Sequence, residues 1–430
     1  MLVRLKRTQD RLRSSLFFVP MLFVFGGVAG GELMLLADRS INNVPDRLRA
    51  TVDSARSVLS VIAGATLTFA GVAFSVSLLL ISLASSQYSP RVVHGLFRDP
   101  FNKRVMGIVI GTFTYCVVVM RAVRGPLEES GKAIVPNISV QVAVVLGVVA
   151  ILAIVAFISH GAHSMDISKI LARVTEEALD QLRTSRPDTE DDANRLNQEP
   201  PPGDGFTVTF DRDGWIQQID HDALLASLEP ESCLLLATVP GYYAIPNTPL
   251  CRIWPHPTDE DAIRRAVRAA VVIGETRTMQ QDTTYGVRQL VDVALKALSP
   301  GINDPTTAQD ALFHLGVVMR ELLRHGAPAR RRVGTDDRVL LLPEAHTRED
   351  AIGLAFDEVR IASAGQPAVQ IYLLEILHLL ATSLDAPEHA EATAALRRQA
   401  ELVLEVSELA ELPERDRQRV RSAHRSRFAS

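Results

Sequence analysis

Four long runs with hardly a charge in the first part of the chain constrain the fold most strongly. They extend over residues 16–36, 58–84, 105–122 and 138–158 of the 430-residue sequence. A helix needs about 20 apolar residues to cross the hydrocarbon core of a bilayer, and only residues 105–122 fall slightly short of that length. Three further spans after the first, and no small-residue cleavage site, argue against a signal peptide. The sequence therefore predicts an α-helical membrane domain with four transmembrane helices.

Basic residues flank these runs unequally. Nine Lys and Arg residues precede the first run or separate the second from the third, whereas seven lie in the other two intervals, where five acidic residues dilute them. Positive charge is enriched on the cytoplasmic side of membrane proteins. We therefore expect the N-terminus in the cytoplasm, and an even number of spans leaves the C-terminus there too.

The overall composition excludes several other classes of protein. Hydrophobic residues make up 47% of the chain and the mean hydropathy is +0.13, although 22% of the residues are charged. A net charge of −5 argues against nucleic acid as a partner, because that binding depends on concentrated Lys and Arg. Cys116, Cys233 and Cys251 are too few and too scattered for a disulfide framework or a zinc site. We expect no metal and no cofactor.

The second run differs from the others because small and hydroxyl residues recur along one helical face. This pattern suits a seam where membrane helices pack closely. It also suits a hydrated path at the centre of an oligomer, where hydroxyls replace part of an ion's water shell. Both interpretations stay open here. The candidate pore-lining residues are Ser60, Gly64, Thr68, Gly71, Ser75, Ser82 and Gln87.

The boundary after the second run is marked by Pro90, which stops or kinks a helix. Residues 92–101 then form either a short amphipathic helix at the membrane surface or a simple re-entry loop. Glu32 is the one acid expected within a span, near the outer end of the first, and is either a functional residue or an interfacial one. His160 and His163 stand three apart on one helical face; a hydrogen-bonded interfacial role is expected for them rather than metal binding.

The remaining chain divides by composition into four regions after a membrane domain at residues 1–163. Residues 164–204 read as a helical stalk followed by an acidic, proline-rich linker. Residues 205–256 predict a small β-barrel or sandwich, residues 257–385 a helical domain, and residues 386–430 a helical tail with a basic end. The tail is either a solvated helix or a contact for acidic headgroups. The predicted fold class is thus a four-helix membrane domain followed by a cytoplasmic α+β region.

Within the β region, short segments with alternating or β-branched residues predict four strands, at 205–210, 214–219, 233–239 and 249–254. From Thr258 onward the sequence predicts helices only. Thr258 is the expected cap of the first, whose buried face we extend as far as Val271 and Gly274.

The stretch from Gly274 to Gly316 is unusually rich in polar groups and turn signals. Arg288 and Asp292 are spaced i, i+4 on one helix face, and Asp304 is the expected cap of the helix that starts at Pro305. Its candidates for a cytoplasmic ligand site are Arg277, Gln281, Asp282, Arg288, Asp292, Asn303 and Asp304. Three interpretations stay open: an anion pocket built on Arg277, Arg288 and the helix start at Pro305, acid–base catalysis by two Asp, or a structural polar network. Because no nucleophile, metal or cofactor motif accompanies these residues, we do not expect an enzyme.

Two segments carry a resemblance to a known family. The words "ASSQYSPRVV" (84–93) and "QDTTYGVRQLVDVALKALSPGINDPTTA" (281–308), together with the four-span layout, resemble the bacterial family of predicted membrane proteins DUF2254. The likeness extends from the first span to about residue 342. It implies a multi-pass protein of the bacterial inner (plasma) membrane, and it implies no activity, substrate or functional residue.

Two classes of function are consistent with these observations. The first is a homo-oligomeric ion channel or pore whose cytoplasmic part serves as an assembly or gating domain. The alternative is a membrane-anchored ligand-sensing or scaffold module without a pore. In both, the expected partners are membrane lipids and further copies of the chain, and the sequence does not identify an ion or small ligand.

Overall fold

The computed structural model divides into two compact units. One comprises Met1–Asp166 and the other Ile167–Ser430, and we call them the N-terminal unit and the C-terminal unit. The structure describes residues 18–40, 50–87, 100–125, 135–164, 166–184, 200–324, 330–343, 347–384 and 386–428. Residues 92–99 of the predicted interfacial segment and most of the predicted linker therefore lie outside the described residues, and Pro100 and Phe101 begin helix α5.

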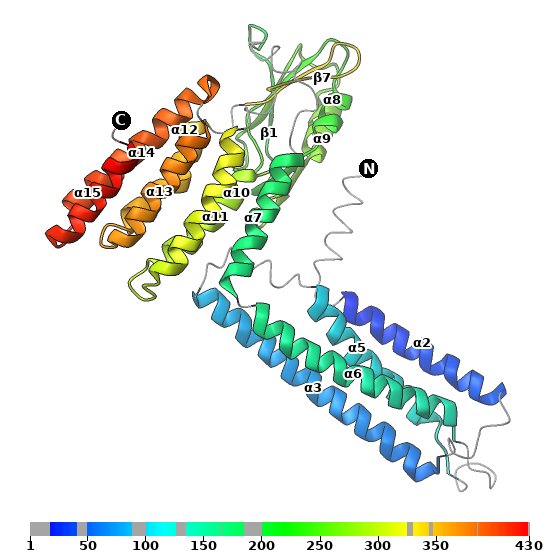
Figure 1. The fold of residues 1–430 in the computed structure, drawn as a ribbon. Coiled ribbons are helices and arrows are strands. Elements are labelled where there is room, and N and C mark those ends of the chain that lie inside the picture. Colours follow the sequence, from blue (N-terminus) through cyan, green and yellow to red (C-terminus); the bar gives the residue numbers. More distant parts are fainter. Residues whose placement is uncertain are drawn as a thin grey trace. The chain divides into compact units, whose positions relative to one another are not determined.

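The N-terminal unit is built from four long helices (Figure 1). They are α2 (Phe18–Ser40), α3 (Val52–Gln87), α5 (Pro100–Ala122) and α6 (Asn137–Ser164). Each is long and apolar enough to cross a membrane, with the candidate span of α3 ending at Leu79 and that of α6 at Gly161. The predicted four spans are confirmed.

Helix α5 lies at the centre of this unit and packs against α2, α3 and α6. Glycines let α2 approach it closely: a Cβ added at Gly27 would lie 2.6 Å from the carbonyl oxygen of Gly111. Small residues at helix contacts are typical of membrane bundles, where dispersion forces act over short distances. The core between α3, α5 and α6 contains Leu59, Tyr115 and Cys116.

The C-terminal unit contains two sheets that share one hydrophobic core. The five-stranded sheet has the order β1-β5-β3-β8-β7 and the three-stranded sheet the order β4-β2-β6, so both are open and, of the predicted barrel or sandwich, the barrel is wrong. The strands are β1 (Phe206–Thr209), β2 (Gly214–Ile219), β3 (Cys233–Leu236), β4 (Tyr243–Ala244), β5 (Pro249–Trp254), β6 (Val271–Gly274), β7 (Arg331–Val333) and β8 (Val339–Leu341).

Strands β6, β7 and β8 correct the prediction that only helices follow Thr258. Helix α9 (Glu260–Ala270) ends one residue before β6, and Asp259 caps it instead of Thr258, accepting a hydrogen bond from Ala262 N. Val271, which we expected on the buried face of this helix, pairs with Ile219 in the three-stranded sheet. The apolar residues of β6 continue the helical spacing of α9, so a helical and a strand pattern coincide in this segment.

Helices make up the rest of the C-terminal unit and stack in two layers (Figure 1). One layer joins α10, α12 and α14 in succession, and the other joins α7, α11, α13 and α15. The helices are α7 (Ile167–Thr184), α8 (His221–Ser227), α10 (Thr283–Ala297), α11 (Pro305–Arg324), α12 (Arg348–Ala362), α13 (Pro367–Ser383), α14 (Ala390–Leu409) and α15 (Glu414–Phe428).

Candidate functional site

The seven residues of the predicted ligand site fall into separate hydrogen-bond networks along α10 and its flanking loops. The first surrounds Asp282, which is only 4% exposed and caps α10 by accepting from Tyr285 N at 3.1 Å. Arg277 donates to both carboxylate oxygens, at 2.5 and 3.1 Å, and to the hydroxyl of Thr284 at 2.9 Å. A bidentate arginine–carboxylate pair of this kind is among the stronger hydrogen-bonded contacts in proteins.

Two aromatic rings complete this Arg277 cluster. The guanidinium lies 5.9 Å from the ring centroid of Trp215 and 5.2 Å from that of Tyr285, within the range of cation–π attraction. Gly241, with a φ of +92°, passes so close that an added Cβ would lie 2.2 Å from Asp282 Oδ2. The cluster therefore joins three separate segments, the loop before β4, strand β2 and the start of α10.

Gln281 belongs to a second contact, with the end of strand β2. Its Oε1 accepts from Ile219 N at 2.8 Å and its Nε2 donates to Ile219 O at 3.2 Å. The side-chain amide thus pairs with both backbone groups of Ile219, as a neighbouring strand would. Gln281 fixes the turn before α10 to the three-stranded sheet.

Arg288 and Asp292 form a third network, which joins α10 to α12. Arg288 donates to Asp292 at 2.8 Å and, through its two terminal nitrogens, to both oxygens of Glu358 at 2.5 and 3.1 Å. The predicted i, i+4 pair of Arg288 and Asp292 is confirmed. Glu358 lies far along the chain, and no sequence signal identified it.

Asn303 and Asp304 lie in the loop between α10 and α11. Asn303 adopts a φ of +48° and accepts a hydrogen bond from Gln366 at 2.8 Å, which ties this loop to the start of α13. Asp304 caps α11 by accepting from Thr307 N at 3.1 Å, as predicted. The hydroxyl of Thr307 also donates to Asp304 at 2.6 Å and lowers the pKa of the carboxyl.

These networks bear directly on the predicted anion pocket. Arg277 is paired with Asp282, Arg288 with Asp292 and Glu358, and the start of α11 is capped by Asp304. An anion at these groups would have to displace an internal carboxylate. The pocket stays a prediction, and the geometry favours the structural interpretation of the cluster.

The stretch from Gly274 to Gly316, which we call the motif, also packs against α7, the helix that follows the last candidate span. Gly286 allows close approach, since a Cβ at this position would lie 2.7 Å from the Cβ of Ala178. Thr175 Oγ1 and His314 Nδ1 lie 2.8 Å apart, and burial lowers the pKa of His314. The motif thus connects α7 with α10 and α11, a role that the sequence did not reveal.

In the N-terminal unit, the small-residue face of α3 points away from the other three helices. Its buried positions are instead Ala55, Leu59, Ala63, Thr66 and Ala73. An added Cβ at Gly64 or Gly71 would meet no atom within 4 Å. Gln87 is the last residue of α3. The exposed positions are Ser60, Gly64, Thr68, Gly71, Ser75 and Ser82, and we call them the α3 stripe.

The polar residues near the ends of the membrane helices have internal partners. Glu32 forms an ion pair with Arg121 at 2.5 Å on the exposed surface. Asp38 caps α6 by accepting from Ile138 N at 2.9 Å and from Ser139 N at 2.8 Å. The His160 ring lies 4.5 Å from that of Phe101, which suits an interfacial packing role.

Metal and thiol chemistry find little support in the part of the chain that the structure describes. No group of three or more His, Cys, Asp or Glu side chains among those residues is placed to hold a metal ion. Burial raises the pKa of Cys251 to about 12 and also raises that of Cys233, so both thiols stay protonated at neutral pH. A protonated thiol is a poor nucleophile.

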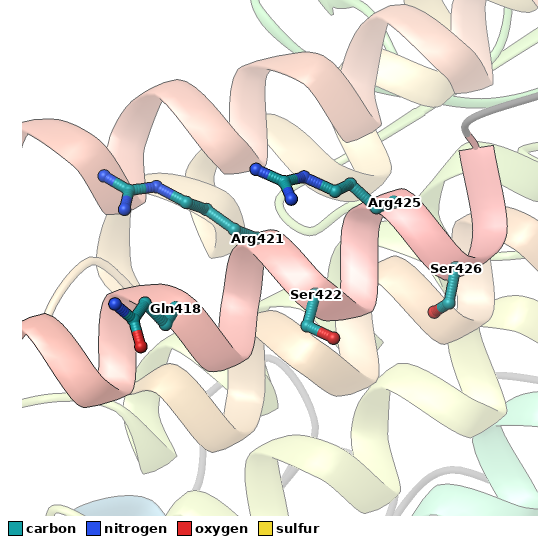
Figure 2. A pocket seen from close by; sticks show the side chains of 5 residues that line it. All are labelled: Gln418, Arg421, Ser422, Arg425 and Ser426. Atoms are coloured by element: carbon teal, nitrogen blue, oxygen red, sulfur yellow. The ribbon is translucent and has the colours of Figure 1, made fainter.

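Figure 2 shows a surface pocket of about 590 Å³ on α15. Its lining residues are Gln418, Arg421, Ser422, Arg425 and Ser426. Because all five come from one helix, the pocket is an open depression and not an enclosed ligand site. Arg421 is also paired with Glu408 at 2.5 Å and with Glu414 at 2.8 Å.

Four apolar helices followed by a separate α/β unit define a multi-pass membrane protein. The chain belongs to the family of predicted membrane proteins DUF2254, whose model matches residues 13–378. Helices α14 and α15 lie beyond the matched part.

Among its relatives are uncharacterised proteins of Mycobacterium bovis and Mycobacterium tuberculosis H37Rv. Each is 30% identical over 403 residues, which cover 91% of this chain and 76% of the relative. No solved structure matches the chain.

Proposed function

We propose that the protein is a homo-oligomeric membrane channel in which the α3 stripe of each subunit faces a central hydrated path. The observation that carries the proposal is the direction of this stripe, which is exposed on the four-helix unit and is not its internal seam. Hydroxyl groups can replace part of an ion's water shell, and a Cβ added at Gly64 or Gly71 would meet no atom within 4 Å, so this face is open.

The C-terminal unit offers a second surface for assembly. Phe313 and Val317 on α11 and Tyr372 and Leu379 on α13 are exposed by 41, 51, 38 and 51%. The rings of Phe313 and Tyr372 meet edge to face, with centroids 5.5 Å apart, so the two helices present one apolar surface. Contiguous exposed apolar side chains commonly mark protein contacts.

The proposal includes an orientation. The basic residues that flank the spans support cytoplasmic N- and C-termini in a bacterial inner membrane. The C-terminal unit would then serve as a cytoplasmic assembly or gating domain. Ion or ligand identity is not part of the proposal, and no catalytic activity is assigned.

One observation favours the alternative, a membrane-anchored sensing or scaffold module without a pore. The hydroxyl of Ser75 donates to Gly71 O at 3.0 Å. A hydroxyl that bonds to its own helix needs no water. Such a face is suited to a dry contact between subunits.

Replacing Ser75 with Leu distinguishes the two functions. In reconstituted bilayers, a channel should lose ion flux while its oligomer survives, because an apolar ring closes a narrow path by dewetting. A dry contact should instead dissociate, because the larger side chain cannot fit between close helices. Val72→Leu is the matched control, since Val72 is 53% exposed on the same helix outside the stripe. Absence of flux from the unmodified protein would refute the channel.

A further inference from the structure

Three loops of the C-terminal unit lie at the same end of its helical stack. They connect α10 with α11 (residues 298–304), α12 with α13 (residues 363–366) and α14 with α15 (residues 410–413). In Figure 1 these loops and the first turn of α7 lie at one end of the stack, and we call this surface the loop end.

Contacts between the helices establish this arrangement independently of the view. His314 follows the start of α11 by nine residues, and its partner Thr175 follows the start of α7 by eight. Gly286 precedes the end of α10 by eleven residues and contacts Ala178, eleven residues into α7. Helices α7 and α11 therefore run in the same direction. Their first residues lie at the same level as the end of α10.

Hydrogen bonding and chain connectivity place the other two loops at the same end. The bond between Gln366 and Asn303 holds the start of α13 beside the start of α11. Helix α14 returns antiparallel to α13 after a short connection, so its end reaches the same level. The short link from α14 to α15 then also lies at the loop end.

Each connection at this end has one exposed large aliphatic side chain in the loop or in the helix turn just before it. Ile302 in the loop before α11 is 38% exposed, Ile361 at the end of α12 is 62% exposed, and Leu409 at the end of α14 is 79% exposed. At the opposite end, the connection between α13 and α14 buries Leu384 and His389, which are 1% and 7% exposed. Single exposed apolar residues are ordinary. Three at successive connections of one surface point to a shared apolar partner.

The chain itself indicates what that partner is. Helix α6 ends at Ser164 and α7 begins at Ile167, so the first turn of α7 is held a few residues from the end of a membrane span. We propose that the loop end contacts the lipid bilayer and inserts Ile302, Ile361 and Leu409 at the boundary between headgroups and acyl chains. Because a tether raises the effective concentration of the surface at the membrane, weak insertion of each side chain is sufficient.

The charges at this end indicate an apolar contact and not an electrostatic one. Lys169 and Arg415 are exposed in the first turns of α7 and α15, but Glu411 is exposed in the adjacent loop. Mixed charge gives little net attraction to anionic headgroups. Contact should therefore depend on the aliphatic tips and change little at high salt or with the fraction of anionic lipid.

Site-directed fluorescence in the full-length protein tests the proposal. Cys116 and Cys251 are buried and Cys233 is half-buried, so a Cys233→Ser background leaves single cysteines at Ile302, Ile361 or Leu409 as the reactive sites. Each is labelled with an environment-sensitive dye after reconstitution into phosphatidylcholine vesicles, with and without phosphatidylglycerol. The control is Glu388→Cys, because Glu388 is exposed at the opposite end of the stack.

At all three loop-end sites we expect a blue shift and several-fold stronger quenching by spin-labelled lipid than at Glu388→Cys, in either lipid mixture and at high salt. Equal quenching at all four sites, with full access for an aqueous quencher, would overturn the proposal. A second outcome would also overturn the proposal. The labelled sites would be protected from the aqueous quencher without being quenched by spin-labelled lipid, and this protection would disappear when each nanodisc holds one copy of the protein. The surface would then be a contact with a second subunit. This outcome does not depend on whether the protein conducts ions.

Discussion

Asp282 and Asp304 offer a matched pair of substitutions that isolates the energetic role of the Arg277 cluster. Both carboxylates cap a helix by accepting from the backbone N–H three residues on. Only Asp282 is buried and paired with Arg277, whose side chain is 21% exposed. Replacing either residue with Ala removes a cap, but Asp282→Ala also leaves the guanidinium largely buried without its counter-charge.

The expected costs differ severalfold. Loss of a cap costs about 0.5–2 kcal/mol. Removing one partner of a buried ion pair costs about 3–5 kcal/mol, and we take the lower limit because Arg277 retains some solvent and the Thr284 hydroxyl. Asp304→Ala, which removes only a cap, should therefore cost about 1 kcal/mol. Asp282→Ala removes a cap and also breaks the ion pair, so the two costs add to about 4 kcal/mol. For a unit of this size the melting temperature falls by about 2–4 °C per kcal/mol, so the two shifts should be about 3 and 12 °C.

Intrinsic fluorescence of the full-length protein in detergent can measure these shifts. The two tryptophans of the chain, Trp215 and Trp254, both belong to the C-terminal unit and report its unfolding. Arg277→Met added to Asp282→Ala removes the uncompensated charge and should restore most of the difference from Asp304→Ala. Equal shifts for the two Asp variants, or no recovery in the double variant, would refute the reasoning.

Three further predictions concern other parts of the chain. Gly241→Ala should destabilise the C-terminal unit more than Gly203→Ala in the same thermal assay, since both have positive φ but only Gly241 lies against a carboxylate. Burial lowers the pKa of His221 from 6.5 to about 4, so the folded state binds this proton less readily than the unfolded state does. Stability should then fall as the pH is lowered from about 6.5 to about 4, and His221→Gln should weaken this dependence in acid titrations. An impermeant thiol reagent should label Asp46→Cys but not Ser430→Cys in intact cells, and labelling of Ser430→Cys from outside would contradict the proposed orientation.

Local patterns account for the parts of the fold that were predicted from the sequence. The spans follow from length and lack of charge, and strands β1, β2, β3 and β5 from alternation between turn signals. The cap at Asp304 depends on neighbouring residues only. Strand β6 was missed because Val271–Gly274 continues the apolar pattern of α9, and β7 and β8 because three-residue strands carry almost no periodic signal.

The candidate site was only partly predictable, because local spacing determines some of its contacts and tertiary packing determines the others. Arg288 and Asp292 are one helical turn apart, so their pairing follows from spacing. The partners Trp215, Glu358 and Gln366 are distant in sequence, and only tertiary packing brings them to Arg277, Arg288 and Asn303. Likewise, helical spacing defines the α3 stripe but not whether it faces the other helices or the outside.

The parallel pairing of β3 with β8 has a consequence for how the chain is made. Cys233 pairs with Val339, so more than a hundred residues must be synthesised between the two partners. Until β8 leaves the ribosome, β3 presents an unpaired edge, and such edges are sites of aggregation and non-native pairing. Long-range pairing also slows folding, because loop closure precedes the gain in contacts. The helices of the N-terminal unit emerge well before this sheet can close, which makes completion of the sheet a late event in the biogenesis of the protein.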